Sequence, residues 1–72
     1  MADFNEGAIA DYTEAIRLDP SNADAHYNRG IAKSAIGDKK GAKTDYLNAA
    51  KLYDKQGNNA KAIYATERSH IL

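Results

Sequence analysis

Hydrophobic side chains recur at three- and four-residue intervals along most of the chain, which is the spacing of amphipathic α-helices. The clearest stripe, between residues 39 and 55, consists of Ala42, Tyr46, Ala49, Ala50 and Tyr53. No segment alternates apolar and polar residues for long, as a half-buried strand would. The pattern therefore predicts an all-α fold.

Capping residues and a proline set the limits of the first predicted helix. Asp3 and Glu6 have the spacing of a capping box, in which the aspartate accepts from backbone N–H groups and the glutamate reaches back. Pro20 lacks an amide donor and disfavours helical geometry in the residue before it, so the helix should end near Leu18.

Polar caps and glycines delimit three further helices. The caps are Ser21 or Asn22, Asp38 and Asn58, and the terminating glycines are Gly37 and Gly57. The predicted helices span residues 23–36, about 39–55 and 58 onward. On the last helix we expect a partly polar packing stripe of Ala60, Ile63, Tyr64, Glu67 and Ile71. The residues expected to face water there are Lys61, Arg68 and Ser69.

One helical pattern occurs twice, 34 residues apart. Gly7-Ala8, Asp11-Tyr12, Ala15 and Leu18 recur as Gly41-Ala42, Asp45-Tyr46, Ala49 and Leu52. A fixed period of this length is typical of stacked-repeat proteins, in which each unit buries its apolar face against its neighbours. Gly30 costs stability within a helix, so we expect it at a close crossing with Ala42 or a neighbouring small residue.

Small and aromatic residues are regularly spaced in the segment between Ala23 and Gln56, which contains Tyr27-Asn28-Arg29-Gly30, Gly37-Asp38, Gly41-Ala42, Tyr46 and Ala49. With this spacing of small and aromatic residues it resembles one complete tetratricopeptide repeat. Residues 3–20 resemble the second helix of a preceding unit, so the chain is expected to open in mid-repeat, and residues 57–72 are predicted to form a capping helix. The resemblance implies one domain over residues 1–72, an α-solenoid fragment of about four antiparallel helices.

The resemblance also implies a function and a binding face. Members of the family act as non-catalytic scaffolds for protein–protein interaction, so we expect the chain to bind a peptide segment or a partner subunit. The inner face of such repeats is lined by the first helix of each unit. The implied partner-binding residues here are Asp24, Tyr27, Asn28, Ile31 and Ser34. Ile31 and Ser34 supply no positive charge, so recognition of a terminal carboxylate is not expected.

Two alternatives of another kind stay open. The first helix presents Ile9, Tyr12 and Ile16 without its own partner helix, so the chain could be a structural element that forms a homo-oligomer. Alternatively, it is a fragment whose specificity lies in other repeats. Residues 1–32 hold six acidic and two basic residues, whereas residues 33–72 hold eight basic and four acidic ones. Two copies could therefore pair through their first helices or stack end to end.

Length and composition limit the remaining classes of protein to which the chain could belong. Seventy-two residues form one small domain, the net charge is zero, and the chain has no cysteine for a disulfide or thiolate metal site. Without a signal pattern or an apolar run of about 20 residues, we expect a soluble cytoplasmic protein.

Candidate chemistry is sparse. His26 and His70 are far apart in sequence and have no partner at metal-ligand spacing, so we expect each to be a partly exposed helix residue. The carboxylates that could pair are Asp11, Glu14, Asp45 and Asp54, and we expect these to face solvent. We predict no enzymatic activity, metal or cofactor. A remote alternative is nucleic-acid binding through the basic C-terminal half, where Lys39, Lys40, Lys43, Lys51 and Lys55 accompany Tyr46 and Tyr53.

Overall fold

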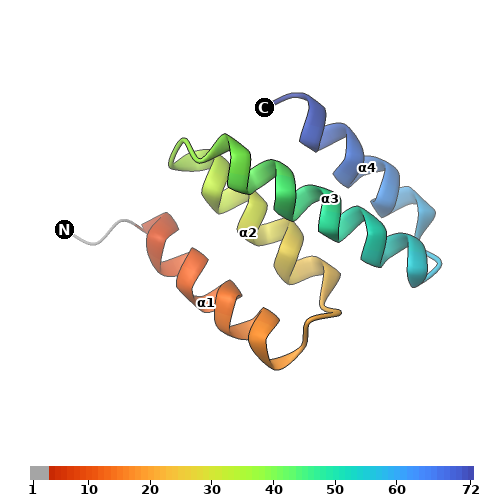
Figure 1. Ribbon diagram of the computed structural model, residues 1–72, viewed down its shortest axis with the longest axis horizontal. Coiled ribbons are helices and arrows are strands. Elements are labelled where there is room, and N and C mark those ends of the chain that lie inside the picture. The colour runs from red at the N-terminus through yellow and green to blue at the C-terminus, as the bar shows by residue number, and fades with distance from the viewer. Residues whose placement is uncertain (1–3) are drawn as a thin grey trace.

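A computed structural model describes residues 4–72 as four α-helices. They are α1 (Phe4–Leu18), α2 (Ala23–Ala35), α3 (Lys39–Lys55) and α4 (Asn59–His70). Each helix packs on the next along the chain, with α1 and α4 at opposite ends of the stack (Figure 1). The predicted all-α helical-repeat class is confirmed.

The helix ends follow from the predicted caps. Asn22, Asp38 and Asn58 each accept a hydrogen bond from a backbone N–H three residues ahead. Gly37 and Gly57 have φ of 87° and 78°, a conformation in which a side chain would be strained, and they turn the chain after α2 and α3. The predicted Asp3 cap lies outside the described residues.

Small residues dominate the core. A cluster made of Ala23, Ala49, Ala50, Tyr53, Ala62 and Ala65 joins α2, α3 and α4. The predicted close crossing at Gly30 is confirmed, because a Cβ there would lie 3.3 Å from the Ala42 carbonyl oxygen. It would also lie 2.9 Å from the ring of Tyr46, which is thus the larger neighbour. Only glycine at this position leaves room for the tyrosine.

The predicted solvent-facing role of Asp45 is wrong. Its side chain is 1% exposed and lies between Arg29 and Lys33 of α2. The Arg29 guanidinium donates to both carboxylate oxygens, at 2.7 and 2.9 Å, and the Lys33 ammonium lies 3.2 Å from Oδ2. Burial alone would raise the pKa of Asp45, but the two cations hold it below its usual value. Arg29 and Lys33 of α2 therefore compensate a buried charge on α3.

The predicted exposure of His26 is also wrong, since this residue is buried. Its Nε2 lies 3.1 Å from the Pro20 carbonyl oxygen, and a carbonyl can only accept, so this nitrogen carries the proton. The contact fastens the start of α2 to the loop before it. His70 is exposed, as expected.

On α4 the predicted packing face is wrong. The buried residues are Ala62, Ala65 and Ser69, whereas the large side chains of Ile63, Tyr64 and Ile71 are exposed. Ser69 was expected to face water, but it is buried and its hydroxyl donates to the Thr66 carbonyl oxygen. Small residues permit the close approach of α3 and α4, so the bulky side chains turn outward.

Candidate partner-binding site

A pocket of about 250 Å³ lies where α2, α3 and α4 meet. Its lining residues are Asp24, Tyr27, Tyr53, Lys61 and Tyr64. The ring of Tyr27 lies between two others, with centroids 5.4 Å from Tyr46 and 6.1 Å from Tyr64, both in tilted contact. Tilted aromatic pairs at such distances are favourable. The rings of Tyr27 and Tyr64 therefore form an apolar wall along the pocket.

Charged groups surround one end of this tyrosine pocket. The Tyr53 hydroxyl donates a hydrogen bond to the Asp24 carboxylate. The Lys61 ammonium lies 3.7 Å from Asp24 Oδ1 and 5.6 Å from the centre of the Tyr53 ring. Burial, together with the bond to Asp24, raises the pKa of Tyr53 far above its usual value, so its phenol stays protonated. Asp24 and Lys61 thus neutralise each other at the pocket edge.

Arg68 extends the site along α4. Its Nη2 donates to the Tyr64 hydroxyl at 3.2 Å, and its guanidinium carbon lies 5.4 Å from the centre of the Tyr64 ring. The bond to Arg68 lowers the pKa of Tyr64, whereas burial raises the pKa of Tyr27. Among residues 4–72, no carboxylate forms an ion pair with Arg68. The site therefore carries one positive charge that has no ion-pair partner among residues 4–72.

The sequence-predicted binding residues divide into two groups. Asp24 and Tyr27 line the pocket together. Asn28 and Ser34 are half-buried and Ile31 is 41% exposed, but none of these three lines it. The predicted self-association residues Ile9, Tyr12 and Ile16 all lie on α1 and are half-buried, away from this site.

Sequence reasoning missed the contributions of Tyr53, Lys61 and Tyr64. Tyr53 was expected in the packing stripe and is buried, and Lys61 was expected to face water and is exposed, but both also border the pocket. Tyr64 follows its N-cap Asn58 by six residues, as Asn28 follows Asn22. Aligning the two helices by their caps, rather than by the 34-residue period, would have placed Tyr64 at the position of Asn28.

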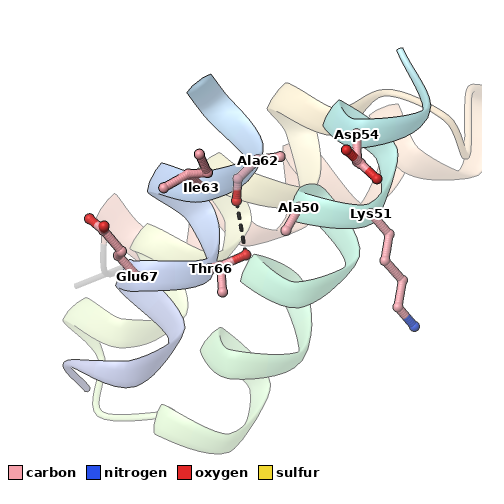
Figure 2. A pocket seen from close by; sticks show the side chains of 7 residues that line it. All are labelled: Ala50, Lys51, Asp54, Ala62, Ile63, Thr66 and Glu67. Atoms are coloured by element: carbon pink, nitrogen blue, oxygen red, sulfur yellow. Dashed lines mark hydrogen bonds between the residues drawn. The ribbon is translucent and has the colours of Figure 1, made fainter. Parts of the chain in front are cut away.

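A second hollow, of about 410 Å³, opens between α3 and α4 (Figure 2). Ala50 and Ala62 line it, and the Thr66 hydroxyl beside them donates to the Ala62 carbonyl oxygen at 2.9 Å. Lys51 and Glu67 extend away from it on opposite sides. This hollow is larger than the tyrosine pocket, but the Thr66 hydroxyl is already hydrogen-bonded within α4, and Lys51 and Glu67 extend away. The tyrosine pocket is therefore the better candidate for a binding site.

Other kinds of site find little support in the described residues. Residues 4–72 contain no group of histidine and acidic side chains arranged to hold a metal ion. None of their helices has the length and hydrophobicity of a segment that crosses a membrane. Tyr46 and Tyr53, considered above for stacking with bases, are both buried, whereas base stacking needs an open ring face.

Comparison with known protein families gives one match. A family model described as a TPR repeat, the tetratricopeptide repeat, matches residues 5–37. The matched residues cover most of α1, all of α2 and the turn at Gly37. The predicted resemblance to this family is thereby confirmed over residues 5–37. No significant match to a curated protein or to a solved structure was found.

Proposed function

We propose that this chain, which carries a tetratricopeptide repeat, is a non-catalytic protein-interaction module that binds a peptide segment of a partner across α2 and α4. Repeats of this family generally mediate contacts between proteins. The observation that carries the proposal is the tyrosine pocket, in which rings from three helices converge around a space of about 250 Å³.

The pocket chemistry favours an apolar or aromatic anchor. Aromatic side chains that enter well-packed pockets supply much of the free energy at protein interfaces. Tyr27 and Tyr53 are already held by their neighbours, so little conformational entropy is lost when a side chain is inserted between them. We expect one anchor side chain of the peptide to occupy the pocket.

Charge favours an acidic residue next to that anchor. Asp24 and Lys61 compensate each other, which leaves Arg68 as the unbalanced charge beside Tyr64. An acidic group near Arg68 would complete an ion pair at the rim, where such pairs contribute more to specificity and association rate than to affinity.

Selection from a displayed library of random twelve-residue peptides tests the proposal. We expect enrichment of peptides with an apolar anchor beside an acidic residue. Tyr64→Ala should weaken a selected peptide by about tenfold or more, the loss typical of an interface anchor. The double variant Tyr27→Ala and Asn28→Ala should also weaken it while helicity by circular dichroism is kept.

Tyr12→Ala on α1 is the matched control, because it removes a half-buried tyrosine remote from the pocket. It should leave peptide affinity unchanged. Selected peptides that bind the Tyr64→Ala chain as tightly as the unaltered one would rule out the pocket as the binding site.

A further inference from the structure

One set of four residues occurs on both α1 and α3 but is covered only on α3. On α3 this pairing face consists of Ala42, Asp45, Tyr46 and Ala49, each no more than 1% exposed. On α1 the same face consists of Ala8, Asp11, Tyr12 and Ala15. There Asp11 is exposed and the other three are half-buried. The pairing face of α1 is therefore accessible to a partner.

The α2 helix shows what such a face binds. Gly30 leaves room for the Tyr46 ring, whereas Arg29 and Lys33 hold the Asp45 carboxylate from either side. The complementary surface is thus a helix with an arginine, then a glycine, then a lysine three positions later. All three residues meet groups that α1 duplicates.

We infer that the pairing face of α1 binds a helix of a partner protein that carries this basic and small pattern. The small residue would accept the Tyr12 ring as Gly30 accepts Tyr46. The two cations would pair with Asp11 as Arg29 and Lys33 pair with Asp45. This inference concerns a surface separate from the tyrosine pocket, so it holds or fails independently of the proposed peptide site.

A second copy of the chain is a poor match for this face. Its own Arg29 and Gly30 are already covered by α3. At the same distances from the N-cap, α4 has Ala65 and Thr66 in place of Arg29 and Gly30, and Ser69 in place of Lys33. If α1 of one copy packed on α4 of another copy as α3 packs on α2, Asp11 would be buried without a cation. The Tyr12 ring would also be pressed against a side chain where Tyr46 meets a glycine. Both changes are costly.

Charge gives the face its selectivity. A wholly apolar helix could cover Tyr12 and the alanines, but it would remove water from Asp11 without replacing the lost hydrogen bonds. A cationic helix restores them, because charge-assisted bonds to a carboxylate are among the stronger protein hydrogen bonds. The exposed carboxylate thus discriminates against uncharged helices.

The test uses the chain's own complementary helix as a probe. A fluorescent peptide of residues 21–37 would be stapled between positions 24 and 31, both exposed in the intact chain, so that it is helical before binding. Titration with the full chain should show saturable binding by anisotropy. Asp11→Asn in the chain should weaken it by about tenfold or more. A peptide carrying Arg29→Ala and Lys33→Ala should lose affinity to a similar extent.

Glu14→Gln is the matched control, since Glu14 lies on the same helix but pairs with Arg17 at the surface. This variant should bind the peptide as the unaltered chain does. Absence of saturable binding, or equal affinity for the Asp11→Asn chain, would overturn the inference. So would peptide-induced amide shifts centred on Tyr46 rather than Tyr12, which would indicate displacement of α2. A dimeric mass by light scattering without peptide, lost in Asp11→Asn, would assign the face to a second copy instead.

Discussion

The α1 and α3 helices carry the same alanines, aspartate and tyrosine at matching positions, yet no residue of α1 is buried and six residues of α3 are. The difference lies in the neighbours. Among the described residues α3 packs against helices on both sides, α2 and α4, whereas α1 packs mainly on α2. In a stacked repeat, burial is thus set by position in the stack as much as by sequence.

The largest expected contrast is between the two tyrosines. Tyr46→Ala should destabilise the chain by about 3 to 5 kcal/mol, because it removes a fully buried ring and leaves a cavity beside Gly30. Tyr12→Ala should cost less than about 2 kcal/mol, since its ring is only half-buried. Urea unfolding followed by circular dichroism measures both. Equal losses would show that α1 is covered in solution.

The two aspartates should differ almost as much. Asp45→Ala leaves Arg29 and Lys33 facing each other without a counter-ion, which should cost about 3 kcal/mol. Asp11→Ala removes an exposed carboxylate and should change the free energy of unfolding by less than about 0.5 kcal/mol. The helix propensity of alanine affects both variants alike, so the difference isolates the buried ion pairs.

The pH dependence of stability should reveal the same contrast between Asp45 and Asp11. The pKa of Asp45 is held low in the folded chain, so its contribution to stability is present above the unfolded pKa of about 3.9 and is lost as pH falls through the folded value. We expect stability to decline in acid less steeply for Asp45→Asn than for the unaltered chain. Asp11→Asn should retain the steeper decline. Parallel curves for the unaltered chain and Asp45→Asn would contradict a paired Asp45.

The smallest contrast involves the glycines that begin each motif. A Cβ at Gly7 meets nothing within 4 Å, so Gly7→Ala should stabilise α1 by about 0.5 to 1 kcal/mol. A Cβ at Gly41 would lie 2.3 Å from Asp38 Oδ2, so Gly41→Ala should displace the α3 cap and cancel that gain. Differential scanning calorimetry should resolve the two melting temperatures. A similar rise in both would show that the cap tolerates the methyl group.

Much of the fold was accessible from sequence because it rests on local rules. The caps at Asn22, Asp38 and Asn58 and the turns at Gly37 and Gly57 depend on the residues beside them. The crossing at Gly30 followed from the cost of a glycine within a helix, although the size of Tyr46 as its neighbour did not. Four helices in order follow from such signals together with the 34-residue period.

The errors arose where a distant residue decides the outcome. Asp45 and Asp11 occupy the same motif, so no local pattern distinguishes the buried carboxylate from the exposed one. What distinguishes them is the pair of cations on α2, which only packing brings to Asp45. The face of α4 was misassigned because apolar size was used as the signal for burial, whereas its close contact with α3 requires small residues such as Ala65. The pocket combines side chains from three helices, so no single-helix pattern could predict it.

Because the helices stack in the order of the sequence, they should also differ in how readily each one opens. Because each helix packs mainly on its neighbours in sequence, opening can proceed from an end without disrupting the middle. The α1 helix, with no buried residue, should exchange its amide hydrogens through local fraying long before the whole chain unfolds. The amides of α3, flanked on both sides, should exchange only in the rare globally unfolded state. Hydrogen exchange should therefore show protection that rises from α1 to α3, and a bound helix on α1 would reduce that gradient.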